Sequence, residues 1–245
     1  MRLKGKVAVV TGGNRGLGRS IAQAFLAEGA AVMLAARDAG AASDLLDGQP
    51  DHVAFQPTDV RDPASVERLM RVAADRFGGL DILVANAGIS RPGPITAISP
   101  DQWADVVGTN LTGVFLCVRS AVPYLARSEA GRVITVSSVL GSRPVANAAA
   151  YCATKAAVEA FTRSVALELA PQGITVNCLA PGFIDEGMGR ALRRNEAVWA
   201  RYRDKLTSGR MGRGDEVAGA AVFLAGEESS YVNGHVLEVN GGLAW

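Results

Sequence analysis

The stretch VAVVTGGNRGLGRS, residues 7–20, decides the fold. Its first five residues are small or β-branched and uncharged, which is typical of a parallel strand buried on both faces. Glycines at 12, 16 and 18 follow, and they permit a tight turn whose backbone amides approach a phosphate at a helix N-terminus. The spacing differs from the common G-x-G-x-x-G, but strand, turn and helix occur in the order that dinucleotide binding requires. We therefore predict a dinucleotide-binding turn at Thr11–Gly18.

Strand-like and helix-like patterns alternate along the rest of the chain. The expected strands are Lys6–Thr11, Ala31–Ala35, Val53–Gln56, Ile82–Asn86, Val133–Ser137, Thr175–Ala180 and Val236–Val239. The expected helices are Ser20–Glu28, Pro63–Phe77, Asp101–Arg127, Ala148–Ala170 and Glu216–Ala225. This alternation specifies an α/β fold, a Rossmann-type doubly wound parallel sheet with helices on both faces. No shift in composition marks a boundary, so we predict a single dinucleotide-binding and catalytic domain over residues 1–245.

One segment interrupts the alternation. Residues 181–214 are charged and punctuated by glycine, with weak helical periodicity. The segment follows the carboxyl end of an expected strand, where open α/β sheets bind ligands. Loops of this length rarely lack a role. We predict a substrate lid over residues 183–210, and the alternative is an ordinary surface insertion.

Composition argues against several functions. The formal net charge is +1 over 245 residues without a basic cluster, which argues against a nucleic-acid partner. Three separated cysteines and two histidines offer no paired metal-ligand spacing, so no metal site is expected and the thiols should be reduced. We find no apolar run of membrane-spanning length and no targeting segment. The chain is expected to be cytoplasmic and without a membrane partner.

The end of the second strand bears on the choice of cofactor. In AAVMLAARD, residues 30–38, an acid at the strand tip would bind the ribose hydroxyls of NAD, whereas an arginine would accommodate the 2′-phosphate of NADP. We place Ala36 at the tip, followed by Arg37, with Arg15 in the nearby glycine turn. Two guanidiniums favour NADP(H) over NAD(H). A shift of one or two residues would instead put Asp38 at the ribose.

A tyrosine and a lysine lie one helical turn apart in YCATK, residues 151–155. Residues at i and i+4 share a helical face, so the phenol of Tyr151 and the ammonium of Lys155 can meet. Taken alone, the pair favours the simpler interpretation of a packed tyrosine ring beside a lysine that extends into water. The neighbouring motifs decide between these interpretations.

Together these motifs resemble those of the compact short-chain dehydrogenase/reductases over nearly the full chain. The turn TGGNRGLG matches the family pattern TGxxxGxG, and YCATK matches the tyrosine and lysine of its active site. The other matches are Asp59 in TDV, ANAG at 85–88, Asn110 in TNLTGVF, Ser138 in VSSVLG, APG at 180–182 and VNGG at 239–242. Length and C-terminal pattern are most similar to the 3-oxoacyl-acyl-carrier-protein reductases.

The resemblance implies a set of site residues. The catalytic ones would be Asn110, Ser138, Tyr151 and Lys155. The cofactor-binding ones would be Gly12, Asn14, Arg15, Gly16, Leu17, Gly18, Arg37, Asp59, Val60, Asn86, Ala87, Gly88, Tyr151, Lys155, Pro181, Gly182 and Ile184. The family also implies a homotetramer, joined through the helices at 101–127 and 148–170 and the C-terminal segment.

The implied chemistry requires a lowered pKa for the Tyr151 phenol. A free phenol titrates near 10, and lowering its pKa by about three units requires roughly 4 kcal/mol. An ammonium about 4 Å away at an effective dielectric near 20 supplies about that much, so we expect Lys155 to lower the pKa of Tyr151. Tyr151 would then protonate a carbonyl oxygen that Ser138 also binds. Lys155 would hold the nicotinamide ribose, and Asn110 would hold a water by bending its helix locally.

Two positions depart from the family pattern. A threonine usual after PG is matched by Glu186, which puts its side-chain contact with the cofactor in doubt. Arginines that acyl-carrier-protein reductases present near the site are matched by Glu129 and Gln172, so an acyl-carrier-protein partner is doubtful. Nearby arginines, which are either substitutes or ordinary surface charges, are Arg91, Arg143, Arg193 and Arg194.

The main hypothesis is an NADPH-dependent carbonyl reductase that transfers hydride to a ketone, with 3-oxoacyl thioesters as the first substrate candidate. An NAD(P)-dependent dehydrogenase of a sugar, polyol or cyclic alcohol would use the same residues in reverse. A non-catalytic dinucleotide-sensing protein on the same fold is the alternative from another class. The complete set of Asn110, Ser138, Tyr151 and Lys155 argues against that alternative.

Overall fold

A computed structural model describes residues 1–244, and Trp245, the last residue of the predicted domain, lies outside the described residues. Within residues 1–244, seven strands form one parallel sheet in the order β3-β2-β1-β4-β5-β6-β7. The strands are β1 (Val7–Thr11), β2 (Ala31–Ala36), β3 (Val53–Pro57), β4 (Ile82–Ala85), β5 (Arg132–Val136), β6 (Thr175–Pro181) and β7 (Val236–Val239). The predicted doubly wound α/β fold is confirmed.

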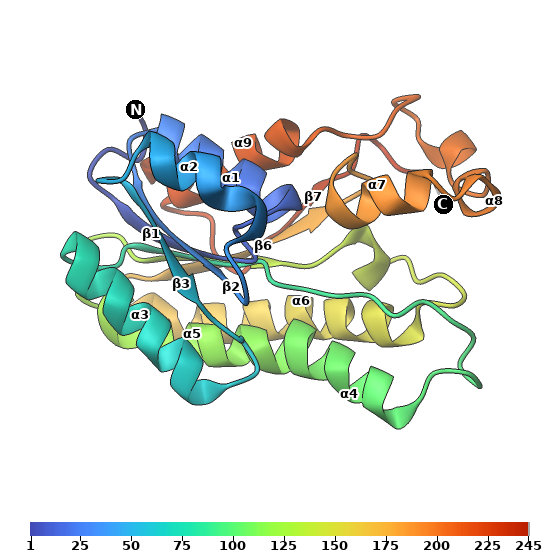
Figure 1. Cartoon of the computed structure of the whole chain (residues 1–245), viewed down its shortest axis with the longest axis horizontal. Coiled ribbons are helices and arrows are strands. Elements are labelled where there is room, and N and C mark those ends of the chain that lie inside the picture. Colours follow the sequence, from blue (N-terminus) through green and yellow to red (C-terminus); the bar gives the residue numbers. More distant parts are fainter. Residues whose placement is uncertain (245) are drawn as a thin grey trace.

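Helices cover both faces of this sheet (Figure 1). On one face lie α1 (Gly16–Ala27), α2 (Ser43–Gly48) and α9 (Gly214–Ala225). On the other lie α3 (Pro63–Phe77), α4 (Pro100–Val107), α5 (Gly113–Leu125) and α6 (Ala149–Leu169). Short 3₁₀ turns occur at Gly40–Ala42, Val139–Gly141, Ala170–Gln172, Arg203–Lys205 and Glu227–Ser229. The sequence patterns did not indicate α2.

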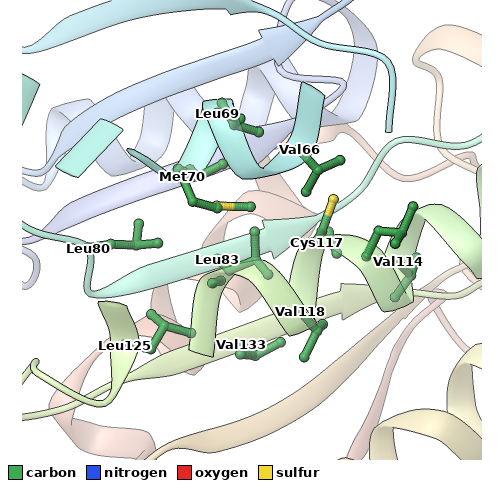
Figure 2. Close-up of a cluster of buried hydrophobic side chains, with 14 of the residues drawn as sticks. Val66, Leu69, Met70, Leu80, Leu83, Val114, Cys117, Val118, Leu125 and Val133 are labelled. Carbon is green, nitrogen blue, oxygen red and sulfur yellow. The ribbon is translucent and has the colours of Figure 1, made fainter. Parts of the chain in front are cut away.

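The strands read as continuous apolar runs because each packs on both faces. In β1, Val7 and Val9 join the core beneath α3, α5 and α6, whereas Ala8 and Val10 join the core beneath α1 and α9. Figure 2 shows the first of these cores, in which Met70 of α3 and Leu83 of β4 pack among side chains of α5. This period of two places apolar side chains on both sides of a parallel strand.

Two helices begin with a capping residue followed by a proline. Asp62 accepts a hydrogen bond from the backbone of Ala64 at 3.0 Å, and Pro63 occupies the first turn of α3. Ser99 and Gln102 form a reciprocal capping box at the start of α4. Such caps satisfy amides that have no partner within the helix.

The predicted single helix at 101–127 is interrupted. Between α4 and α5 the backbone forms a π-helical turn, Gly108–Thr112, in which the Gly113 amide bonds the Gly108 carbonyl. In the described part of the chain, this continuous helical stretch, Pro100–Leu125, is the one that is long and apolar enough to cross a membrane by length and composition. Its apolar residues contribute to the core against α3 and β4, as expected for a core helix of an α/β protein.

The segment after β6 contains more regular structure than its weak periodicity indicates. It forms α7 (Gly187–Arg193), α8 (Glu196–Trp199) and the turn at Arg203–Lys205. The ring of Phe183 lies 6.3 Å from that of Trp199 and 4.9 Å from that of Tyr202. These short helices are therefore held by aromatic packing rather than by their own hydrogen bonds alone.

The strand order reverses between β1 and β4. These two strands are neighbours in the sheet but not in the sequence, so the connections that leave them run in opposite directions. In open α/β sheets, ligands bind outside the carboxyl ends of the strands at such a switch point. The predicted site residues must lie there if they share one site.

Candidate active site

The glycine turn follows β1 and leads directly into α1. Gly12 and Gly16 have φ values of +66° and +53°, which disfavour residues with a side chain. A Cβ on Gly18 would lie 2.2 Å from the Gly12 carbonyl oxygen and 2.5 Å from Asn86 Nδ2. The turn therefore packs its backbone against the loop after β4 and leaves the amides at the start of α1 directed outward. This cradle fits a pyrophosphate.

Thr11, which begins the predicted turn but is not among the predicted site residues, joins the two loops at the switch point. Thr11 Oγ1 accepts hydrogen bonds from the backbone amides of Asn86 and Ala87, each at 3.0 Å. Asn86 Nδ2 donates in return to the Thr11 carbonyl at 2.8 Å. The position of Thr11 at a strand end, next to the first glycine of the turn, is the sequence signal that could have identified it.

The tip of β2 is where the sequence places it, since the strand ends at Ala36. Arg37 and Asp38 follow as exposed residues, and Asn14 Nδ2 donates to the Asp38 carbonyl at 2.9 Å. The Asn14 side chain thereby ties the glycine turn to this loop. The Asp38 carboxylate faces its own turn, 2.8 Å from where a Cβ on Gly40 would lie.

Asp59 and Val60 follow β3 and face the same edge of the sheet. Arg61 donates to both Asp59 carboxylate oxygens, the shortest distance being 2.8 Å. These bonds, with a smaller contribution from the positive charge of Arg37, lower the pKa of Asp59. Val60 packs against the start of α5, where a Cβ on Gly113 would lie 2.8 Å from it. Arg37 and Asp59 are thus near neighbours on one side of the cradle.

The predicted catalytic pair lies in α6 and faces the end of β5. Lys155 is 3% exposed, and its Nζ lies 5.6 Å from the centre of the Tyr151 ring. It donates a 2.7 Å hydrogen bond to the Val136 carbonyl. Ser138, two residues further, hydrogen-bonds the Tyr151 phenol. The structure therefore brings Ser138, Tyr151 and Lys155 together.

The electrostatics of this group correct one expectation. Burial raises the pKa of the Tyr151 phenol, and the Ser138 hydrogen bond opposes the rise only in part. Burial also lowers the pKa of Lys155 to about 8. The expectation that Lys155 lowers the pKa of Tyr151 is wrong for the chain by itself. Desolvation disfavours both charged forms, and it is the largest cause of both shifts.

Asn110 lies in the π turn and is fully buried. Its Oδ1 accepts from the Ile89 amide at 2.8 Å, and its Nδ2 donates to the Ile89 carbonyl at 2.9 Å and to Thr154 Oγ1 at 3.2 Å. The predicted local distortion of the helix is confirmed, because π turns of this kind interrupt α-helices, frequently at functional sites. One amide hydrogen of Asn110 therefore holds the loop after ANAG, and the other binds α6.

The segment after β6 contributes backbone more than side chains. Pro181 ends the strand, and a Cβ on Gly182 would lie 2.8 Å from Asn240. The Ile184 side chain joins the core beneath α1 and α9, so it is turned away from the cradle. Glu186 lies in the groove between α1 and α9, where a Cβ on Gly214 would lie 3.0 Å from its carboxylate.

The carboxyl ends of six neighbouring strands therefore supply the predicted site. Gly88 completes it beneath the catalytic group, since a Cβ there would lie 3.4 Å from Asn110 Oδ1 and 3.5 Å from Lys155 Nζ. Arg15 and Leu17 lie in the glycine turn and its first helical residues. Three of the arginines considered as carrier contacts are paired with acids, namely Arg91 with Asp105, Arg143 with Glu238 and Arg193 with Asp185.

Comparison with known proteins agrees with this geometry. A family model described as Enoyl-(Acyl carrier protein) reductase matches residues 12–244. The chain is 39% identical over 243 residues to the 3-oxoacyl-[acyl-carrier-protein] reductase of Vibrio cholerae and 40% identical to that of Salmonella typhimurium, with 99% of each chain covered. A crystal structure of 3-ketoacyl-(acyl-carrier-protein) reductase from Brucella melitensis, complexed with NADH, has a TM-score of 0.91 at 32% identity and covers 98% of both chains.

The chain belongs to the short-chain dehydrogenase/reductase family. It is therefore an NAD(P)-dependent oxidoreductase that acts on a carbonyl or alcohol group, and its cofactor is a nicotinamide dinucleotide.

Proposed function

We propose that the chain is an NADPH-dependent reductase of 3-oxoacyl thioesters. The observation that carries the proposal is the convergence of two hydroxyl groups, those of Ser138 and Tyr151, above the buried ammonium of Lys155. The two hydroxyl groups are hydrogen-bonded to each other, and a pair of neighbouring O–H donors suits a carbonyl oxygen that gains negative charge during reduction. The relatives that are 39% and 40% identical are reductases of such a ketone.

Each of the four predicted catalytic residues has a separate role in the proposed reaction. Ser138 donates a hydrogen bond to the carbonyl oxygen and orients the ketone. Tyr151 gives its proton to that oxygen, and its raised pKa keeps the proton available at neutral pH. Lys155 stabilises the phenolate that remains, because its ammonium lies over the ring. Asn110 holds the Ile89 loop against α6 and so fixes the floor of the site.

When bound, the dinucleotide supplies the hydride. Its pyrophosphate would lie on the glycine turn, with the amides of Gly16 to Gly18 at the start of α1 as donors, and its adenine beside Asp59 and Val60. Asn86, Ala87, Gly88, Pro181 and Gly182 would border the nicotinamide half. Ile184 would contribute backbone only, since its side chain is in the core.

The preference for NADPH rests on Arg37 and Arg15. Both side chains are exposed beside the cradle, and a guanidinium binds a 2′-phosphate in a forked geometry. Asp38 follows Arg37, but its carboxylate faces Gly40. A ribose 2′-phosphate bound there would have the guanidiniums of Arg37 and Arg15 as partners.

We further propose that residues 183–210 act as a lid and that the chain forms a single catalytic domain. Four copies of the chain would assemble into a homotetramer, located in the cytoplasm. The lid proposal is supported by the contact of Gly187 with Gly16, where a Cβ on Gly16 would lie 3.4 Å from the Gly187 Cα. The proposal does not specify the acyl carrier, because Glu129 and Gln172 are exposed but neither is a cation that would favour an acidic carrier protein.

The description of the matching family model names a second candidate, reduction of an enoyl thioester. In that reaction Tyr151 would protonate the enolate that hydride addition to the double bond leaves. We place ketone reduction first because the relatives named above are 3-oxoacyl-[acyl-carrier-protein] reductases, and they align with this chain over 99% of both sequences.

A substrate panel tests the proposal. Initial rates of NADPH oxidation are measured with acetoacetyl-coenzyme A, crotonyl-coenzyme A and a set of sugar and cyclic ketones. We expect acetoacetyl-coenzyme A to have the highest kcat/KM of the panel. Turnover of crotonyl-coenzyme A alone would establish the enoyl reaction, and turnover of sugar or cyclic ketones alone would show that the thioester assignment is wrong.

A further inference from the structure

A buried carboxylate lies one helical turn beyond Lys155 and takes no part in the chemistry described above. The side chain of Glu159 is 10% exposed, although it belongs to α6, whose opposite face is open. Acidic side chains are rarely buried unless they are paired, because desolvation of a charge is costly. The inner contacts of Glu159 therefore need an explanation.

Those contacts lead to the residue before Ser138. The Ser137 hydroxyl lies 3.0 Å from Glu159 Oε1 and 3.0 Å from the Lys155 carbonyl oxygen. A hydroxyl has one hydrogen to donate, and a carboxylate is the stronger acceptor of the two. A Cβ on Gly141 would lie 2.7 Å from Glu159 Oε1, so the loop that carries Ser138 passes directly over the carboxylate.

A second hydrogen bond runs in the opposite direction. The Lys155 side chain, on α6, donates to the Val136 carbonyl at the end of β5. The Ser137 side chain, just beyond β5, binds the turn of α6 between Lys155 and Glu159. These two reciprocal ties lie next to Ser138 in the chain, and they join it to the helix that carries Tyr151.

The outer contact of Glu159 is weak by comparison. Arg163 lies 3.7 Å from its other oxygen, and the Arg163 side chain is 57% exposed. Ion pairs exposed to this degree contribute little to stability. The contact through Ser137 is therefore the one with a structural consequence.

We propose that Glu159 is a positioning residue for ketone reduction: through Ser137 it holds Ser138 in register with Tyr151. The proposal rests on the proposed function in so far as Ser138 and Tyr151 bind one carbonyl oxygen. Glu159 touches neither substrate nor cofactor. Its loss displaces the donor pair, and displacements of about 1 Å in such sites cost on the order of 100-fold in rate.

Four variants test this role. Ser137→Ala and Glu159→Leu remove the tie from either end, and each should lower kcat by about tenfold or more while the KM for the ketone and the Kd for NADPH change less than about twofold. Glu159→Gln keeps an acceptor oxygen for Ser137 and should recover most of kcat. Arg163→Ala, the matched control, removes only the outer contact and should leave kcat unchanged.

Coupling between the two ends distinguishes positioning from general damage. If the tie is one interaction, the double variant Ser137→Ala/Glu159→Leu should be no slower than the slower single variant. Multiplicative losses in the double variant, or a Glu159→Gln enzyme as slow as Glu159→Leu, would overturn the proposal. If Glu159→Leu fails to fold, an unaltered kcat in the nearly isosteric Ser137→Ala variant would overturn it.

The outcome is separable from that of the proposed function. The wild-type enzyme, the single variants and the double variant are all assayed on whichever carbonyl compound the wild type reduces fastest. A failure with acetoacetyl-coenzyme A therefore affects only the substrate assignment. Tyr151→Phe serves as the reference for lost proton transfer on the same carbonyl. If Ser137→Ala and Glu159→Leu leave kcat unchanged on a substrate whose reduction requires Tyr151, the positioning role of Glu159 is refuted and the proposed function is not.

Discussion

The Lys155 ammonium lies 5.6 Å from the centre of the Tyr151 ring, and burial governs the pKa of both groups. Burial raises the pKa of the Tyr151 phenol above its ordinary value, whereas it lowers the pKa of Lys155 to about 8. The pair therefore offers a protonated acid beside a cation that titrates near physiological pH. In the free enzyme, loss of the lysine proton precedes loss of the tyrosine proton as pH rises.

This order sets the pH dependence of reduction. Below pH about 8 Lys155 is charged and can stabilise the phenolate, and above it the charge is lost. We expect kcat/KM for NADPH, which reports the free enzyme, to fall as pH rises through about 8 while Tyr151 is still protonated. Lys155→Arg, whose guanidinium stays charged, should lack this decline even if its rate is lower. A profile that is flat to pH about 9.5 would contradict the assignment, since a pKa shift of more than a unit would then be missing.

Removal of the phenol hydroxyl tests the proton donor. We expect Tyr151→Phe to lower kcat by about 10²- to 10⁴-fold, the usual contribution of a general acid. NADPH affinity, measured by fluorescence titration, should stay within a few-fold because the ring and Lys155 remain. Turnover close to that of the wild type would show that another group donates the proton.

Reversal of one charge tests the choice of cofactor. Arg37→Asp places a carboxylate at the end of β2, where it would repel a 2′-phosphate and accept from ribose hydroxyls. The ratio of kcat/KM for NADPH to that for NADH should fall at least about tenfold, since hydrogen bonds to charged groups contribute about 1.5–3 kcal/mol. Arg68→Asp, the same charge change on an exposed position of α3, is the control. Equal ratios in the two variants would place the 2′-phosphate elsewhere.

A pair of glycine substitutions tests the cradle. A methyl group on Gly18 would lie 2.2 Å from the Gly12 carbonyl oxygen, so Gly18→Ala should raise the Kd for NADPH at least about tenfold and destabilise the fold by about 1–3 kcal/mol. Gly219, in α9, has no atom within 4 Å of the same position. Gly219→Ala should stabilise the fold by about 0.5–1 kcal/mol and leave the Kd unchanged. Wild-type NADPH affinity in Gly18→Ala would refute close packing of the turn.

The sequence predicts the sheet well because each strand is decided locally. Runs such as Val7–Thr11 are buried on both faces, and the predicted bounds of the strands agree with the structure to within about a residue. The predicted site residues also assemble, because parallel strands bring their carboxyl ends to one edge. The assignment of Arg37 beyond the tip of β2 follows from the same regularity.

Other features depend on contacts that periodicity does not encode. The π turn at Asn110 has helical composition, and only its bonds to Ile89 and Thr154 explain it. The lid helices are short and are held by Phe183, which lies outside their own pattern. Burial raises the pKa of Tyr151, whereas the sequence spacing to Lys155 alone predicts a lowered pKa. Such tertiary effects outweigh local signals at the site itself.

The most direct test of the central claim follows the hydride to its acceptor. Acetoacetyl-coenzyme A is incubated with the enzyme and NADPH carrying deuterium in the transferable position, and the thioester product is examined by mass spectrometry. The account predicts one deuterium at carbon 3 of a 3-hydroxybutyryl thioester, formed by the wild-type enzyme and almost absent with Tyr151→Phe. Unlabelled product, or no product from an enzyme that binds NADPH, would contradict ketone reduction by these residues.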